Sequence, residues 1–186
     1  MRSIIGITGT NGAGKGAVVS YLLEQKGFAH HSASSFIVQE ILRRGLTADR
    51  DSMISVGNEL RASYGADHII RSLYTRARAS EQPAVIESLR ALGEVRCIKA
   101  LGGFVIGVDA EPEIRYQRAL LRGSVKDGVS FEKFIAQELS EMNDHDLVKG
   151  NLLGALAEAD IVVTNNGTLR ELHEQVEKIL AHIRSK

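Results

Sequence analysis

The sequence predicts an α/β fold of three layers, with a five-stranded parallel sheet between helices. The first observation is alternation, because short apolar runs rich in β-branched residues are each followed by a segment of helical periodicity. The second is the continuous apolar character of runs such as 161–163, which suits strands covered on both faces. Right-handed crossovers then place helices on both sides of the sheet, and ligands are expected at the carboxyl ends of the strands.

The elements follow in chain order from these patterns. The apolar runs predict strands at Ile4–Thr8, Phe28–His31, Ala84–Ser88, Phe104–Asp109 and Ile161–Thr164. The segments between them predict helices at Lys15–Gln25, Ser35–Arg44, Leu89–Leu101, Pro112–Arg122, Phe131–Met142 and Leu169–Arg184. Pro112 suits the first position of its helix, and Thr168 suits the cap of the last one.

Two stretches interrupt the alternation within an expected single domain, residues 1–186. From 34 to 80 the pattern stays helical, with breaks near Gly45 and Gly65, which predicts a helical insertion. From 123 to 150 a loop with Gly123 and Gly128 at its ends precedes another helix. Glycines at both ends permit hinge motion, so this stretch is predicted to be a short lid.

Composition restricts the classes of function. The chain has 186 residues, and its 23 Lys plus Arg balance 23 Asp plus Glu, so no general basic field attracts nucleic acid or an anionic membrane. Cys97 is the only cysteine, which excludes an internal disulfide and favours the cytoplasm, where we expect the chain to be a monomer or homodimer. No apolar run approaches the roughly 20 residues of a membrane span. The expected partner is therefore a small molecule rather than nucleic acid or a membrane.

A glycine-rich segment follows the first strand and leads into the first helix. It reads Gly9-x-x-x-x-Gly14-Lys15, the spacing of a phosphate-binding P-loop in its expected context. Glycines allow backbone N–H groups to surround an anion, the helix directs its positive end at it, and lysine adds a full charge. The fold class is therefore a three-layer P-loop nucleoside triphosphate hydrolase fold that binds ATP. The expected nucleotide-binding residues are Gly9, Thr10, Asn11, Gly12, Ala13, Gly14, Lys15, Gly16 and Ala17.

Gly16 and Ala17 occupy positions where many P-loops carry a hydroxyl that binds magnesium. The Gly14-Lys15-Gly16 sequence resembles the adenylate-kinase-like branch of P-loop proteins. That resemblance implies a small-molecule kinase whose Mg²⁺ is held by phosphates and water, without a direct protein ligand. A guanine-nucleotide switch protein would need an Asn-Lys-x-Asp segment, and the sequence contains none.

The third strand ends in Val85-Ile86-Glu87-Ser88-Leu89-Arg90, which brings an acid and a cation to the ligand edge. Glu87 is a candidate to orient a magnesium-bound water or to accept a proton from an acceptor hydroxyl. Arg90 is a candidate to bind an acceptor phosphate in bidentate fashion. The structural alternative is a salt bridge at the end of the strand. Two histidines at the end of the second strand, His30 and His31, lack a convincing set of metal ligands.

Three arginines lie on one face of the helix after the fourth strand, because Arg115, Arg118 and Arg122 are three and four residues apart. Such arginines stabilise the charge of a phosphoryl group in transfer. We expect Arg118 and Arg122 to be catalytic and Arg115 less so. A solvated helix face is the structural alternative.

The final strand and turn, Ile161-Val162-Val163-Thr164-Asn165-Asn166-Gly167-Thr168, closely resemble those of dephospho-CoA kinases. The resemblance implies that Asn166 and Gly167 lie beside the adenine of ATP. The segment 84–95 is also similar to phage-type deoxynucleoside monophosphate kinases, and 57–67 is similar to their acceptor-side lobe. The protein is thus expected to be an ATP-dependent kinase acting on a nucleoside monophosphate or a dephospho-CoA-like molecule.

One region departs from these families. Where relatives place an aspartate and then an arginine, this chain has Ser35 and Val38. Arg43, Arg44 or Arg61 would have to supply the missing cation, and each is equally compatible with a solvated surface. The identity of the acceptor stays open. The departure also leaves an alternative, a nucleotide-binding regulatory protein or nucleoside triphosphatase without efficient kinase activity.

Overall fold

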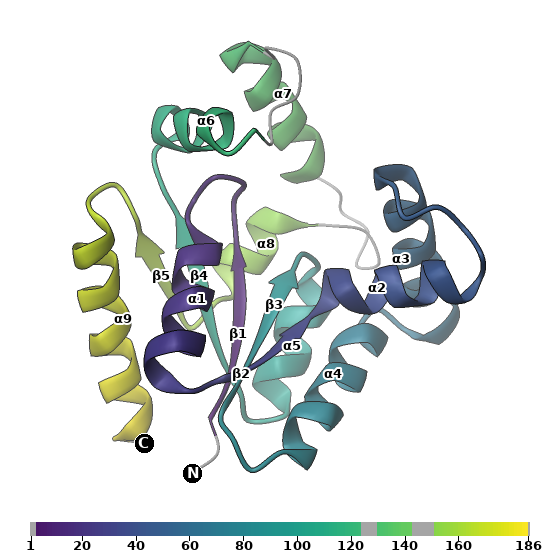
Figure 1. Ribbon diagram of the computed structural model, residues 1–186, viewed down its shortest axis with the longest axis horizontal. Coiled ribbons are helices and arrows are strands. Elements are labelled where there is room, and N and C mark those ends of the chain that lie inside the picture. Colours follow the sequence, from purple (N-terminus) through teal and green to yellow (C-terminus); the bar gives the residue numbers. More distant parts are fainter. Residues whose placement is uncertain (1–2, 124–129, 143–150, 186) are drawn as a thin grey trace.

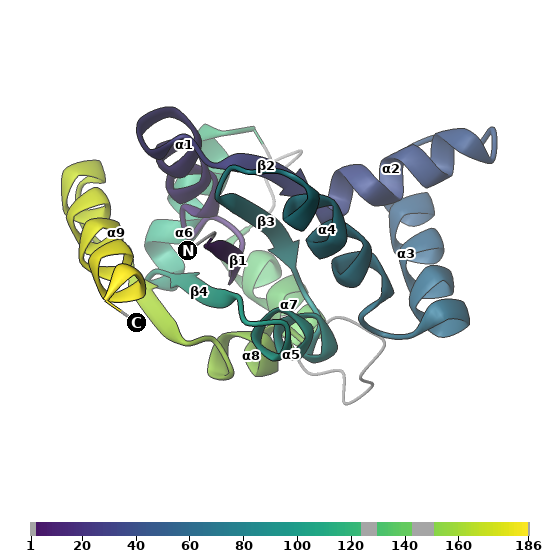
Figure 2. The same cartoon turned by 90° about the horizontal axis from the view of Figure 1, so that it is seen from below.

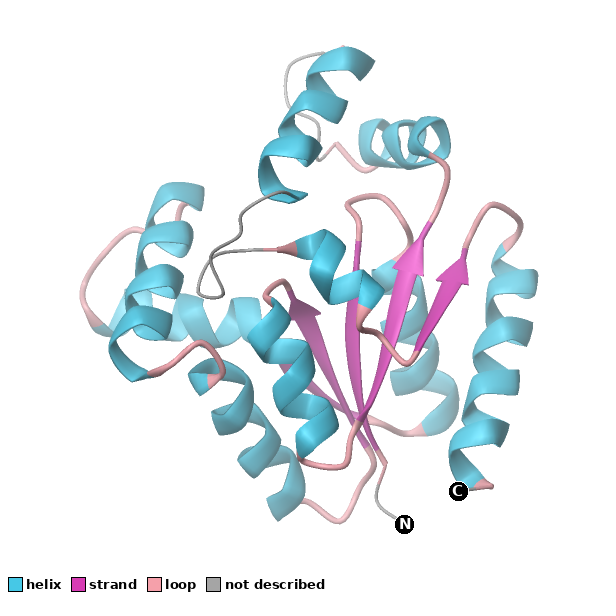
Figure 3. Cartoon of the chain, turned by 180° about the vertical axis from the view of Figure 1, so that it is seen from behind, coloured by secondary structure: helices cyan, strands magenta, loops and turns pink. Residues whose placement is uncertain are grey.

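The computed structural model describes residues 3–123, 130–142 and 151–185 (Figure 1). Within these residues, five parallel strands form one sheet in the order β2-β3-β1-β4-β5, as Figure 3 shows from behind. The predicted fold class is confirmed. Because β1 is central, the loop that follows it opens at the middle of the sheet's carboxyl edge. The strands are β1 Ile4–Gly9, β2 Ala29–Ser32, β3 Ala84–Leu89, β4 Phe104–Asp109 and β5 Ile161–Thr164.

Several helices begin after a residue whose side chain accepts a backbone N–H group of the first turn. Ser32, Asn151 and Thr168 each accept a bond from the backbone N–H three residues ahead. Glycines in the left-handed region follow several helix ends, at Gly27, Gly45, Gly102 and Gly123. The helices are α1 Lys15–Lys26, α2 Ala33–Arg43, α3 Arg50–Tyr64, α4 His68–Ala79, α5 Leu92–Ala100, α6 Pro112–Leu121, α7 Phe131–Met142, α8 Leu152–Ala157 and α9 Leu169–Arg184.

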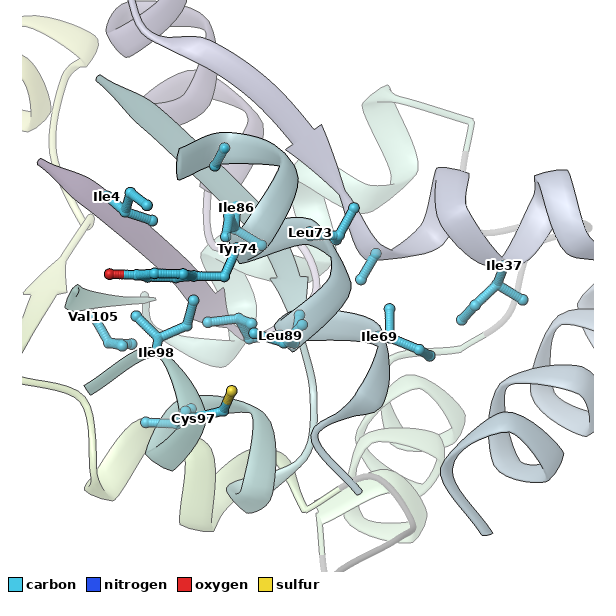
Figure 4. Packing of buried hydrophobic residues seen from close by; sticks show 14 of the residues in the cluster. Ile4, Ile37, Ile69, Leu73, Tyr74, Ile86, Leu89, Cys97, Ile98 and Val105 are labelled. Carbon is cyan, nitrogen blue, oxygen red and sulfur yellow. The ribbon is translucent and has the colours of Figure 1, made fainter. Parts of the chain in front are cut away.

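Helices cover both faces of the sheet and bury two apolar clusters. Ile5 and Ile7 of β1 point to the face covered by α1 and α9. Ile4 points to the opposite face, which is covered by α4, α5 and α8. Figure 4 shows this second cluster, in which Cys97 of α5 is packed among aliphatic side chains. Burial raises the pKa of Cys97 to about 11, so the thiol stays protonated and contributes packing rather than reactivity.

A β-bulge interrupts β3 beside the central strand. Ile7 pairs with Glu87, and the next residue, Thr8, pairs with Leu89, so that Ser88 is the extra residue. Ser88 has a φ of 69°, the left-handed region that favours glycine. The bulge lets Leu89 point into the same cluster as Ile86, three residues earlier. In an unbroken strand these two side chains would face opposite sides.

In the sequence, three helices, α2, α3 and α4, connect β2 to β3. In space, α2 and α3 extend beside the sheet rather than over it (Figure 2). At the other side of the ligand edge, α6 and α7 lie above the strands' carboxyl ends (Figure 1). The predicted lid, residues 123–150, is described only in part. Residues 124–129 and 143–150 lie outside the described residues. None of the described helices combines the length and apolar character that a bilayer crossing requires.

The predicted order of elements needs two corrections. The helix expected to begin at Leu89 begins at Leu92, because the bulge prolongs β3 and Glu94 accepts backbone N–H bonds at the start of α5. The short helix α8 was not predicted. Its six residues are too few to show a helical period clearly.

Candidate functional site

The phosphate loop joins β1 to α1 at the centre of the carboxyl edge. Gly9, Gly12 and Gly14 have φ of 144°, 78° and 102°, conformations that other residues rarely adopt. A Cβ at Gly9 would lie 2.0 Å from the backbone oxygen of Val108, and one at Gly12 would lie 2.3 Å from that of Arg115. The loop is therefore a glycine cradle enclosed by β4 and α6, which fits the binding of a phosphate chain.

Lys15 begins α1, and its ammonium group is held by the loop itself. Its Nζ donates to the backbone oxygens of Gly9 and Thr10, both at 2.7 Å. Burial above all, together with the charges of Arg90 and Arg122, lowers the pKa of Lys15 to about 8. Glu87 and Glu138 act in the opposite direction. Cations from three separate elements are thus close enough to repel one another, an arrangement that an anionic ligand relieves.

Glu87 lies at the end of β3, as predicted, and it has a partner that the sequence did not indicate. His30 Nε2 lies 3.1 Å from Glu87 Oε1, and the two side chains are 40% and 25% exposed. Beside this pair, Thr8 Oγ1 donates to the backbone oxygen of Leu89 at 3.0 Å. The bulge that displaces Ser88 is therefore tied to β1 directly below the phosphate loop.

Arg90 lies in the turn between β3 and α5, which is held by the side chain of Glu94. The Oε2 atom of Glu94 accepts the backbone N–H groups of Arg90 at 2.7 Å and Ala91 at 3.1 Å. Its Oε1 atom accepts Arg61 Nε at 3.0 Å and Nη2 at 2.8 Å. Glu94 is fully buried and Arg61 is 9% exposed. Arg61, a candidate acceptor-binding cation, is thus engaged in a buried ion pair between α3 and α5.

The three arginines of α6 make three different contacts. Arg115 is buried, donates from Nε to the backbone oxygen of Ala110 at 2.7 Å, and pairs with Glu138 of α7. Arg118 Nη1 donates to the backbone oxygen of Asn165 at 2.8 Å. Arg122 Nη2 donates to Asn11 Oδ1 of the phosphate loop at 3.1 Å. Arg118 therefore contacts the turn after β5 and Arg122 contacts the phosphate loop, while Arg115 fixes α6 to α7.

The turn between β5 and α9 is attached to the rest of the site by two asparagines. Asn165 Nδ2 donates to the backbone oxygen of Ala13 at 2.7 Å, which fixes the turn against the phosphate loop. Asn166 Oδ1 accepts the backbone N–H of Glu111 at 2.8 Å. Asn166 and Gly167 are exposed, and a capping box of Thr168 and Glu171 begins α9 behind them.

Two residues of this network were missed by the sequence analysis, Asp109 and Asn165. Thr10 Oγ1 donates to Asp109 Oδ1 at 2.6 Å, and the backbone N–H of Ala110 donates to the same oxygen at 2.9 Å. Asp109 ends β4, next to β1. Its place at the end of a buried strand was the available signal, since carboxyl ends of parallel strands meet at the ligand edge.

The predicted residues at the two ends of α2 lie away from the phosphate loop. Arg43 is the last residue of α2 and pairs with Glu40, with its side chain 72% exposed. Arg44 binds Glu40 and Glu59. Ser35 lies in the first turn of α2, where the backbone N–H of Ser35 donates to the Ser32 hydroxyl and no acidic residue is present. Apart from Arg61, which pairs with Glu94, the other predicted residues lie in the phosphate loop or in the segments around it.

Comparisons with known proteins agree with this fold. The AAA domain family (AAA_18) matches residues 5–140, more than half of the chain. A UPF0200 protein of Pyrobaculum aerophilum is 28% identical over 187 residues, which cover 99% of this chain and 100% of that protein. A UPF0200 protein of Thermococcus kodakarensis is also 28% identical, with 98% of this chain and 99% of that protein covered.

Solved structures give the same architecture. TT1252 from Thermus thermophilus matches with a TM-score of 0.62 and 22% identity, covering 97% of both chains. A shikimate kinase from Acinetobacter baumannii, solved in complex with shikimate, matches with a TM-score of 0.61 and 17% identity, covering 99% of this chain and 96% of that one. At these identities the likeness establishes the fold, a three-layer P-loop fold of the kind found in small kinases.

Proposed function

Because this chain belongs to the AAA domain family, we propose that it is an ATP-dependent kinase, which transfers the γ-phosphoryl group to a nucleoside monophosphate or a dephospho-CoA-like molecule. The observation that carries the proposal is the convergence of Lys15, Arg90 and Arg122 beside the glycine loop. Phosphoryl transfer depends mostly on positioning and on stabilising negative charge, and this convergence supplies both.

Each group of residues has a part in this reaction. The loop amides and Lys15 bind the phosphates, and Arg122 faces them from α6. Arg118 joins α6 to the turn of Asn166 and Gly167, where the dephospho-CoA-kinase resemblance expects adenine. Arg90 binds the acceptor. Glu87 lies on the side of the phosphates where the acceptor binds.

Magnesium fits this site as a metal held mainly by the nucleotide, because Gly16, which follows Lys15, is exposed and has no hydroxyl to offer it. When bound with ATP, Mg²⁺ neutralises the charge that develops on the phosphates. We expect Glu87 to hold one of its water molecules.

An assay of acceptor-dependent ADP release tests the proposal. Purified protein is supplied with ATP, Mg²⁺ and, in turn, nucleoside monophosphates and dephospho-CoA. We expect one acceptor to stimulate ADP release, and Lys15→Ala to abolish it. Lys26→Ala is the matched control, because it removes a lysine from the far end of the same helix, where it pairs with Glu177. Folded protein that binds ATP and releases no ADP with any acceptor would support the regulatory alternative instead.

A further inference from the structure

Asn165 lies where three segments of the site meet. The residue is 5% exposed, and its side-chain Nδ2 donates to the backbone oxygen of Ala13 in the phosphate loop at 2.7 Å. Its backbone N–H donates to the backbone oxygen of Asp109, at the end of β4, also at 2.7 Å. Its backbone oxygen accepts Arg118 Nη1 of α6 at 2.8 Å. One residue therefore connects the phosphate loop, the end of a neighbouring strand and the helix beyond it.

The contact with the phosphate loop is close. A Cβ at Gly14 would lie 2.3 Å from Asn165 Nδ2, so the amide fits against a position that has no room for a side chain. Ala13, which precedes it, is fully buried. Without the amide, the backbone oxygen of Ala13 would lose this partner in a buried place, which is more costly than the loss of an exposed hydrogen bond. The amide therefore fixes the part of the loop that leads into α1.

The backbone of Asn165 begins the turn between β5 and α9, residues 165–168, which we call the base turn. Arg118 holds this turn at two points, because its Nη2 also lies 3.4 Å from the backbone oxygen of Gly167. The base turn is thus fixed to α6 through the backbone of Asn165 and to the phosphate loop through its side chain.

The spacing between the base turn and the phosphate loop matters for a ligand with two parts. ATP consists of adenosine joined to a triphosphate. When both parts bind at once, the affinity far exceeds that of either part, but only if the two subsites are spaced as the ligand requires. A residue that fixes this spacing controls the gain in affinity without touching the ligand.

We propose that Asn165 is a positioning residue that sets the spacing between the base turn and the phosphate loop. It thereby determines how much the adenosine part of ATP adds to the affinity of the triphosphate. This inference rests on the proposed function, in which the triphosphate lies beside Lys15 and the adenine beside Asn166 and Gly167. The amide N–H is the essential group, because its partner is a carbonyl oxygen, which only a donor satisfies.

Calorimetric titration of the full chain with two ligands tests this inference. One ligand is a nonhydrolysable ATP analogue with Mg²⁺, and the other is tripolyphosphate, which lacks adenosine. Asn165→Ala should lower the affinity for the ATP analogue by roughly 10- to 100-fold, and the affinity for tripolyphosphate should change much less. The ratio of the two affinities is the decisive quantity, because a general loosening of the phosphate loop would lower both affinities alike.

Two further variants separate the hydrogen bond from packing. Asn165→Leu keeps roughly the size of the side chain without an N–H donor or a charge, so it should lower the ratio as Asn165→Ala does. It also carries the test alone if the smaller side chain prevents folding. Gln175→Ala is the matched control, because Gln175 Nε2 of α9 lies 3.4 Å from the backbone oxygen of Thr164, at the end of β5. It removes an amide beside the same turn and should leave the ratio unchanged.

Different results would overturn different conclusions. A ratio that is unchanged in the Asn165 variants, whether both affinities persist or fall together, would overturn the positioning role and leave ATP binding in place. Failure of the unaltered protein to bind either ligand would overturn the proposed function as well. The assay of ADP release tests the transfer step separately.

Discussion

At the scale of single residues, the pKa of Lys15 depends on whether phosphates are bound beside it. Lys15 is half-buried, bound to two backbone oxygens and repelled by Arg90 and Arg122, which explains its pKa of about 8. A polyphosphate beside it favours the charged form and raises that pKa. Nucleotide binding and protonation of Lys15 are therefore linked.

This linkage predicts a pH dependence of ATP binding. Free Lys15 is protonated below about pH 8 and loses its proton above it, so the affinity for ATP should fall as pH rises from 8 to 10, by at most about tenfold per pH unit. Calorimetry at pH 8 in buffers of different ionisation enthalpy should show proton uptake on binding. Lys15→Arg keeps its charge in this range and should bind ATP without that uptake, whereas equal uptake in both proteins would contradict the assignment.

Two glycines of the same segment should respond differently to an added methyl group. Gly12→Ala places a Cβ 2.3 Å from the backbone oxygen of Arg115 at a φ of 78°, and the backbone conformation alone should cost about 1–3 kcal/mol in unfolding free energy. Gly16 lies in α1 with nothing within 4 Å of an added Cβ, so Gly16→Ala should raise that free energy by up to about 1 kcal/mol. Urea unfolding of both variants measures the difference, and equal changes would contradict the described loop.

At the scale of elements, a buried ion pair attaches the helical insertion to the rest of the protein. Removing Arg61 leaves the fully buried Glu94 carboxylate without its cation. Arg61→Met should therefore lower the unfolding free energy by about 3–5 kcal/mol. The double variant with Glu94→Met should lose less than the sum of the two single variants, because no unpaired charge remains.

An exposed arginine provides the control for this cycle. Arg43 pairs with Glu40 at the end of α2 with its side chain 72% exposed, so Arg43→Met should change the unfolding free energy by at most about 1 kcal/mol. Chemical unfolding of all four variants gives the comparison. Similar losses for Arg43→Met and Arg61→Met would show that the buried pair does not attach α3 to α5.

The elements also show what the sequence could and could not predict. Apolar β-branched runs located β4 and β5 at their observed bounds. The expectation that 161–163 is covered on both faces was wrong, because β5 is an edge strand on which Ile161 and Val162 are exposed. The glycine spacing located the phosphate loop, since its chemistry is contained in one short segment. The pair of His30 and Glu87 was not predicted, because it depends on which strands are neighbours in the sheet. The burial of Arg115 likewise depends on Glu138, which belongs to another helix.

At the scale of the whole molecule, the phosphate loop is where distant segments meet. Gly9 contacts β4, Gly12 contacts α6, and Asn165 joins Ala13 to the turn before α9. A nucleotide bound there stabilises contacts among all of these segments, so its effect extends beyond the loop.

This arrangement predicts a large thermal shift with nucleotide. A nonhydrolysable ATP analogue at one hundred times its Kd should stabilise the folded state by about 2.7 kcal/mol, which corresponds to roughly 5–10 °C in Tm for a chain of this size. Differential scanning calorimetry with Mg²⁺ and the analogue measures the shift. Lys15→Ala should show little shift at the same concentration, and a full shift in that variant would contradict the role of Lys15 in binding.

The central position of β1 has a consequence for how the chain is made. Ile4 pairs with Ala84 and Ile5 with Phe104, so β1 leaves the ribosome well before the two strands that flank it in the sheet. At about 5–20 residues per second, that interval lasts roughly 5–20 s. During this time β1, the central strand, has no sheet to join. The phosphate loop that follows β1 therefore has no fixed shape either. Nucleotide can therefore assist only the closing stage of folding, after β4 has emerged.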